Sequence, residues 1–138
     1  MATDADDELD IFENSFRVFI FSLEVLSHDA VTQCEEMGNY NTPWEIQRDV
    51  AHGGVALLGS SSCYLTWEQT EKVVALSVLL RELPQEAISP PGMLTTNHAG
   101  CITAMNHPAW EPLRREAAQL LVLLEPAIKR NEAYFQEH

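Results

Sequence analysis

Apolar residues near the start of the chain recur at alternating intervals of three and four, and no other sequence feature constrains the fold as strongly. The members of this row are Leu9, Phe12, Phe16, Phe19, Leu23, Leu26 and Ala30. Such spacing places one apolar stripe along a helix. We therefore predict a single helix from Glu8 to Met37, ended by Gly38. A second row, Ile11, Val18 and Val25, predicts that its buried face is wide.

A second helix is predicted after the turn-rich residues 38–41. Thr42 is a suitable N-cap, Pro43 suits the first helical position, and Glu45 stands where a capping box needs a carboxylate. An apolar row continues from here to about residue 58 and predicts the buried face of this helix. Its members are Trp44, Arg48, Ala51, Val55 and Leu58.

A third helix is predicted between Thr66, which opens a capping box with Gln69, and Pro84. Its buried row is Val73, Leu76, Leu80 and Leu83. Residues 84–94 contain three prolines and are predicted to be an irregular connection. Residues 95–106 are expected to hold a short helix.

The last helix is predicted to run from about Pro108 toward Phe135, with a kink or split at Pro126. Its buried row is Leu113, Ala117, Leu120 and Leu124. No long strand-like alternation is present. With 138 residues the chain has the size of one domain. We predict a frayed acidic tail over residues 1–7 and, over residues 8–138, an all-α single-domain bundle of four to five helices.

Charge limits the classes of partner. The chain has 21 acidic and 8 basic residues, a net charge of −13. Nucleic-acid recognition needs a basic footprint, and anionic membranes repel an acidic surface, so neither is an expected partner. Residues 1–49 hold twelve of the acids and only two bases. This asymmetry predicts an interaction surface for a basic partner, although a solubilising surface would have the same composition.

The cysteines and the start of the chain bear on location. Cys34, Cys63 and Cys101 are odd in number and widely spaced, which is typical of reduced thiols in a cytoplasmic protein. The first residues are acidic, whereas a secretory signal begins with basic residues. No apolar stretch is long enough to span a bilayer. We therefore expect a cytoplasmic location.

No motif for catalysis or for a cofactor is found. His98, Cys101 and His107 have ligand types that zinc accepts, but a structural zinc site needs a fourth ligand that is not evident. Cys63 and His52 are a candidate nucleophile and base, although a buried cysteine is the simpler interpretation. There is no nucleophile elbow and no glycine-rich phosphate loop. We therefore predict no enzymatic activity, no cofactor and no metal.

A binding surface is predicted where the first helix ends and the second begins. If the two helices pack antiparallel, acids from both lie near two aromatic residues, and such a mixture suits an interface with a basic protein. The predicted partner-binding residues are Asp29, Glu35, Glu36, Tyr40, Trp44, Glu45 and Asp49. The alternative, in which Trp44 anchors the second helix in the core, remains open.

In its acidic excess before position 50, its small helical domain and its lack of a catalytic motif, the chain resembles the bacterial toxin immunity proteins, in size and charge over its whole length rather than in any one motif. These proteins protect a cell against its own secreted or contact-delivered toxins. The resemblance implies a cytoplasmic, stoichiometric inhibitor that binds a cognate toxin domain, often a basic nuclease. Its acidic side chains would take the place of substrate phosphates.

A second interpretation is a homodimeric regulatory or adaptor protein without catalytic activity. The first helix carries more large apolar residues than one small bundle needs, and the excess would pair with a second copy of the chain. The residues in question are Phe12, Phe16, Phe19, Phe21, Leu23 and Leu26.

Overall fold

The computed structural model describes residues 4–38, 40–59 and 64–138 of the chain. Over these residues the protein is all-helical, as predicted, but it has eight helices rather than four to five. Their bounds are α1 Asp4–Ser27, α2 Ala30–Met37, α3 Thr42–Leu58, α4 Trp67–Arg81, α5 Gln85–Ile88, α6 His98–Met105, α7 Trp110–Leu123 and α8 Glu125–Glu137. The helix α1 begins inside the predicted acidic tail, of which residues 1–3 lie outside the described part of the chain.

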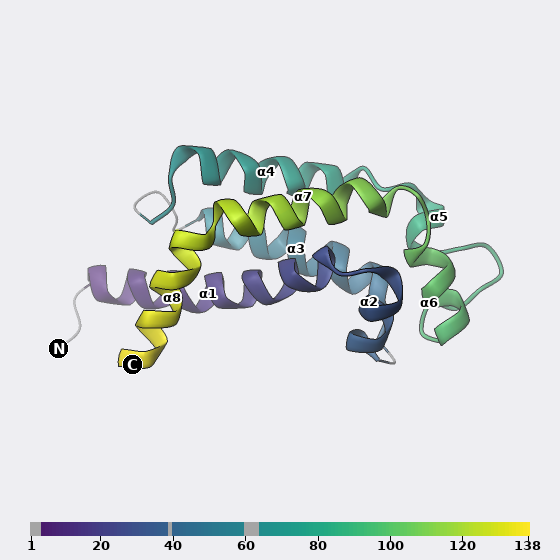
Figure 1. Ribbon diagram of the computed structural model, residues 1–138, viewed down its shortest axis with the longest axis horizontal. Coiled ribbons are helices and arrows are strands. Elements are labelled where there is room, and N and C mark those ends of the chain that lie inside the picture. The colour runs from purple at the N-terminus through teal and green to yellow at the C-terminus, as the bar shows by residue number, and fades with distance from the viewer. Residues whose placement is uncertain (1–3, 39, 60–63) are drawn as a thin grey trace.

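Four long helices form the body of the molecule. α1 packs against α3 and α7, and α4 packs against the same two helices from the other side. Successive members run in opposite directions, which gives an antiparallel four-helix bundle (Figure 1). The short helices α2, α5 and α6 gather at one end, and α8 turns off the end of α7 to lie against α1 (Figure 1).

The predicted first helix is in fact two helices, because the chain breaks between α1 and α2. Asp29 caps α2, and its carboxylate accepts a hydrogen bond of 2.8 Å from the backbone N–H of Thr32. The buried side chain of Gln33 donates to the carbonyls of Val25 and Leu26, at 3.1 and 3.0 Å. These carbonyls lie in the last turn of α1, where the regular helical ladder runs out; Val25 also accepts from the backbone N–H of His28 at 3.2 Å. The apolar row predicts one continuous helix, but the hydrogen bonds of Asp29 and Gln33 stabilise a break between α1 and α2 instead.

The helix α3 begins near the predicted residue but buries a different face. Asn41, rather than Thr42, is its N-cap. The predicted row is largely on the outside, with Val55 51% exposed. The buried row is instead Ile46, Val50, Ala51, Gly54 and Leu57. Gly54 determines this choice, because a Cβ atom there would lie 2.9 Å from Ser77 Oγ on α4. The close approach of α3 to α4 therefore needs Gly54 to face inward.

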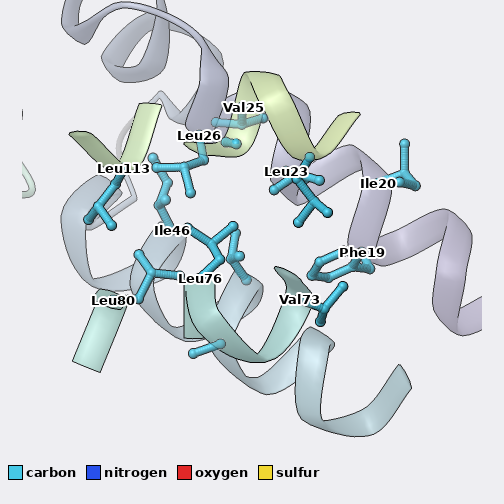
Figure 2. Packing of buried hydrophobic residues seen from close by; sticks show 14 of the residues in the cluster. Phe19, Ile20, Leu23, Val25, Leu26, Ile46, Val73, Leu76, Leu80 and Leu113 are labelled. Carbon is cyan, nitrogen blue, oxygen red and sulfur yellow. The ribbon is translucent and has the colours of Figure 1, made fainter. Parts of the chain in front are cut away.

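The remaining predicted rows form the core. Phe12, Phe16, Phe19, Leu23 and Leu26 of α1 are buried. Val73, Leu76 and Leu80 of α4 are also buried, together with the predicted row of the last helix. Figure 2 shows side chains from α1, α3, α4 and α7 meeting in this cluster. The second predicted row is wrong in part: Val25 is buried, but Ile11 and Val18 face outward.

Capping and proline signals are confirmed at several helix ends. The capping box of Thr66 and Gln69 is present at the start of α4. The last predicted helix is split one residue before Glu125, and Pro126 lies in the first turn of α8. The short helix expected within residues 95–106 is α6. The connection before it is irregular apart from the single turn of α5.

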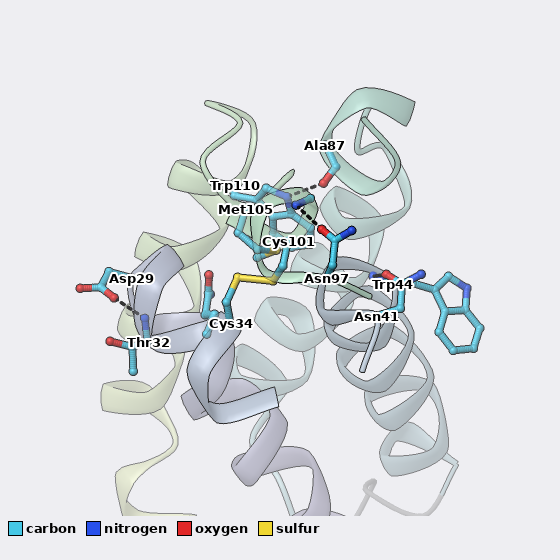
Figure 3. The surroundings of a disulfide bond; sticks show 12 residues. Asp29, Thr32, Cys34, Asn41, Trp44, Ala87, Asn97, Cys101, Met105 and Trp110 are labelled. Carbon is cyan, nitrogen blue, oxygen red and sulfur yellow. Dashed lines mark hydrogen bonds between the residues drawn. A yellow bond between two sulfur atoms is a disulfide. The ribbon is translucent and has the colours of Figure 1, made fainter. Parts of the chain in front are cut away.

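The expectation of three reduced thiols is wrong, because a disulfide joins Cys34 of α2 to Cys101 of α6 (Figure 3). Their Cα atoms lie 6.2 Å apart although the residues are separated by 67 positions in the sequence. The packing of α2 on α6 brings the two side chains together, which spacing along the chain does not reveal. The disulfide also removes Cys101 from the candidate zinc ligands. Cys63, the candidate nucleophile, lies outside the described residues.

Candidate partner-binding surface

The first two turns of α3 carry the most organised group of predicted binding residues. Asn41 accepts a hydrogen bond from the backbone N–H of Trp44, which starts the helix with the indole ring directed outward. Trp44 is 43% exposed. Glu45 and Asp49 follow at helical spacing on the same side. We call Trp44, Glu45, Arg48 and Asp49 the α3 patch.

Arg48 is the centre of the α3 patch. Its guanidinium donates to Glu45 and to Asp49, each at 3.1 Å. It also lies 4.5 Å from the centre of the Trp44 ring, in a cation–π contact. One side chain therefore fixes the indole and offsets the charge of two carboxylates. Arg48 was predicted to belong to a buried row, whereas its separation of four from Trp44 and three from Glu45 is the signal for this surface cluster.

The α2 residues of the predicted site have other partners. Hydrogen bonds from Thr32 lower the pKa of Asp29 below its usual value, so this carboxylate stays ionised while it caps the helix. The carboxylate of Glu36 contacts Nδ1 of His28 at hydrogen-bond distance, at the break between α1 and α2. Glu35 is exposed and enters no ion pair within the described residues.

The structure separates Asp29 from the α3 patch. Figure 3 shows Asp29 and Trp44 on opposite sides of the Cys34–Cys101 disulfide, with Trp44 directed away from α2. The structure brings Trp44, Glu45 and Asp49 together around Arg48. Tyr40 precedes α3 and is exposed. The alternative that Trp44 anchors α3 in the core is not what the structure shows.

A polar cleft of about 400 Å³ lies beside Asp29, where α7 passes the break between α1 and α2. It is lined by side chains of both charges, including His28, Glu111 and Arg114. Arg114 is largely engaged inside the protein, because it donates to Gln33 at 2.9 Å and to the carbonyl of Met105 at 2.5 Å. Burial lowers the pKa of Arg114, and the neighbouring Glu111 acts against that shift. The cleft is therefore a structural junction of mixed charge rather than an acidic surface.

Two further observations concern metal-type clusters and membrane-spanning helices in the described part of the chain. Among residues 4–38, 40–59 and 64–138, no three histidine, cysteine or carboxylate side chains gather as they would around a metal ion. None of the helices seen there combines the length and the apolar composition needed to cross a membrane.

No protein-family model, no curated protein and no solved structure matches this chain. The residues themselves must therefore carry any functional argument.

Proposed function

We propose that this chain is a non-enzymatic binding protein that neutralises a basic partner protein by forming a stoichiometric complex with it. By resemblance, the partner is a cognate bacterial toxin domain of the nuclease type, delivered by secretion or by cell contact. The chain then acts as the immunity protein of the cell that makes both.

The α3 patch is the observation that supports this proposal. The patch holds an exposed tryptophan in contact with an arginine, and both residue types are enriched at binding hot spots. The patch stands on a chain of net charge −13, which attracts a basic protein from a distance. Arg48 fixes the Trp44 ring before any partner arrives, and this lowers the entropy lost on binding.

A cytoplasmic location is part of this proposal, but the argument from reduced cysteines no longer supports it. The disulfide between Cys34 and Cys101 is of a kind that persists in oxidising compartments and is rare in the cytoplasm. The thiol state of the protein in intact cells, trapped by rapid alkylation, tests the location directly.

The alternative, a homodimeric regulatory or adaptor protein, was suggested by six apolar residues of α1. Five of the six apolar residues that suggested it are buried in the core of their own chain, and only Phe21 of that set faces outward. Sedimentation at several concentrations decides the matter, because a homodimer has twice the monomer mass of 15.5 kDa.

The proposal is tested by isolating the partner and then measuring the complex. The tagged chain is used to capture proteins from the native host, and a captured basic protein is then produced separately. We expect binding in equal amounts by calorimetry, weakening with salt, and recovery of growth when the chain is expressed with that protein. Reversing Glu35, Glu36, Glu45 and Asp49 to lysine should abolish the rescue.

A matched control separates local charge from total charge. Reversal of Glu68, Glu71, Glu86 and Glu116 to lysine changes the net charge equally but alters exposed or half-exposed positions on α4, α5 and α7. This control should bind with no more than a few-fold loss of affinity. Equal loss in both variants contradicts an α3-centred surface, and recovery of the bait alone as a dimer contradicts the inhibitor function.

A further inference from the structure

The outward face of α1 carries an apolar row that nothing in the described chain covers. Ile11, Val18 and Phe21 are 59%, 65% and 64% exposed. Their separations of seven and three place them within one narrow strip of the helix surface. Exposed apolar residues are ordinary when scattered, but a row along one helix is a mark of an interaction surface.

A groove lies between α1 and α8, and Phe21 stands one helical turn from Arg17 and from Glu24 at its edge. It has a volume of about 380 Å³, and Ile20, Ile128 and Phe135 supply its apolar lining. Figure 2 places Ile20 at the margin of the core cluster, and Figure 1 shows α8 crossing alongside α1. Glu24 and Glu132 stand at the groove as its acidic residues. Arg17, the base at this site, is held 4.7 Å from the centre of the Phe135 ring.

Charge distinguishes this face from an exposed apolar row on α4. On α4, Trp67, Val74 and Val78 also face outward. The helix α4, however, carries two acids and two bases, whereas α1 carries seven acids, of which Glu13 is buried, and one base. Of the two rows, the α1 row is therefore the one set in a strongly negative field.

We propose that the α1 row and the adjoining α1–α8 groove form a docking surface for a basic amphipathic helix of another protein. The apolar stripe of that helix would lie on Ile11, Val18 and Phe21, and its lysine or arginine residues would face the acids of α1 and Glu132. Amphipathic helices bind apolar grooves in this way, and flanking opposite charges set their orientation. The inference rests on the proposed function in one respect only, since both take the partner to be basic.

A synthetic peptide tests this surface without the native partner. The probe is a helix of about 18 residues, or five turns, with leucine along one stripe and lysine elsewhere. Two control peptides carry glutamate in place of lysine, or the same residues shuffled so that the stripe is lost. Binding of each labelled peptide to the oxidised full-length chain is measured by fluorescence anisotropy, and the site is located from amide chemical-shift changes.

We expect the basic amphipathic peptide to bind and both control peptides to bind at least tenfold more weakly. Phe21→Ser and Glu24→Lys should each reduce the affinity by about tenfold, which corresponds to one well-packed contact. Val74→Ser on α4 is the matched control and should change the affinity less than twofold. All three positions are exposed, so circular dichroism should show folded proteins in each case.

Other results overturn the inference. If Phe21→Ser binds the peptide as tightly as the unmodified chain, or if the shift changes fall on α4, the α1 row is not the docking surface. If the protein alone forms a dimer that Phe21→Ser dissociates, a second copy occupies the row instead. A failure of peptide binding says nothing about the α3 patch. The peptide experiment and the charge-reversal experiment therefore test the two proposals independently.

Discussion

The guanidinium of Arg114 on α7 donates a hydrogen bond of 2.9 Å to the side-chain oxygen of Gln33, a residue 81 positions earlier in the chain. The amide nitrogen of the same Gln33 bonds to the last carbonyls of α1, and Arg114 also reaches the carbonyl of Met105 at the end of α6. Two side chains thus connect the ends of α1 and α6 to α2 and α7. A buried polar network of this kind stabilises one arrangement of helices only while every member is paired.

Replacing Arg114 by methionine should lower the free energy of unfolding by about 2 to 4 kcal/mol, because it leaves the buried oxygen of Gln33 without its donor. Urea denaturation followed by circular dichroism measures the change. Arg115→Met is the control, since Arg115 is exposed and its nearest carboxylate lies 3.9 Å away. That variant should differ by less than about 0.5 kcal/mol. Similar losses in both variants would refute the role of the network.

Reduction of the disulfide should destabilise the protein substantially. Closing a loop of 67 residues removes chain entropy from the unfolded state worth about 4 kcal/mol. Urea denaturation with and without a reductant should show most of this difference, and Cys34→Ser should lose its sensitivity to the reductant. A thiol count in denaturant provides the control. One free thiol is expected for the three cysteines of the chain, and a count of three would rule the bond out.

Gly100 cannot accept a side chain where α6 meets the preceding loop. A Cβ atom there would lie 2.0 Å from the carbonyl oxygen of Leu94, a backbone atom that cannot simply rotate away. Gly100→Ala should therefore cost about 2 kcal/mol or more of unfolding free energy. At Gly53 the nearest atom, on Phe19, would lie at an ordinary 3.4 Å. Gly53→Ala should be neutral or stabilising because alanine favours the helix. Thermal unfolding of both variants measures the two effects. A Gly100→Ala variant as stable as the natural chain would contradict the close packing of α6 against the preceding loop.

Glu13 should give the protein a distinct dependence on pH. Burial raises its pKa above the ordinary value of 4.5, which means that the folded protein holds this proton more tightly than the unfolded chain does. Ionised Glu13 therefore opposes folding, and its effect grows as the pH rises from about 4.5 through the folded pKa. Asp29 has a lowered pKa and acts in the opposite sense.

The comparison of the natural chain with Glu13→Gln isolates this contribution. Gln has the same shape and does not ionise, so the variant should gain stability relative to the natural chain as the pH increases, and the gain should vanish at low pH. Asp29 contributes equally to both proteins and cancels in the difference. Urea denaturation at a series of pH values provides the measurement. A difference that stays constant with pH would mean that Glu13 titrates normally.

Sequence reasoning succeeded where a local signal had no competitor. The rows through Phe16, Leu80 and Leu120 keep unbroken helical spacing, and those residues are buried. Thr66 and Pro126 act on the backbone next to them, so their effects were predictable from neighbouring residues alone.

Prediction from the sequence failed where two local signals competed, or where the contact that determines the structure joins residues far apart in the sequence. The helix α3 offers two possible faces, and the inward turn of Gly54 depends on Ser77 of another helix. The break after Ser27 depends on hydrogen bonds of Gln33. The disulfide depends on the packing of α2 against α6. For the candidate surface, the residue types were predicted, but the separation of Asp29 from Trp44 by the disulfide follows only from the three-dimensional arrangement.

The bond between Cys34 and Cys101 closes a covalent ring that contains the whole of α3, α4 and α5. A chain pulled from its two ends can therefore never be drawn out fully while the sulfurs remain joined. The ring withholds 67 residues, or roughly 220 to 240 Å of contour length, from the stretched molecule. Only the segments outside the ring, which include α1, α7 and α8, can be fully extended. Under mechanical load the covalent ring therefore persists after the helical bundle has unfolded.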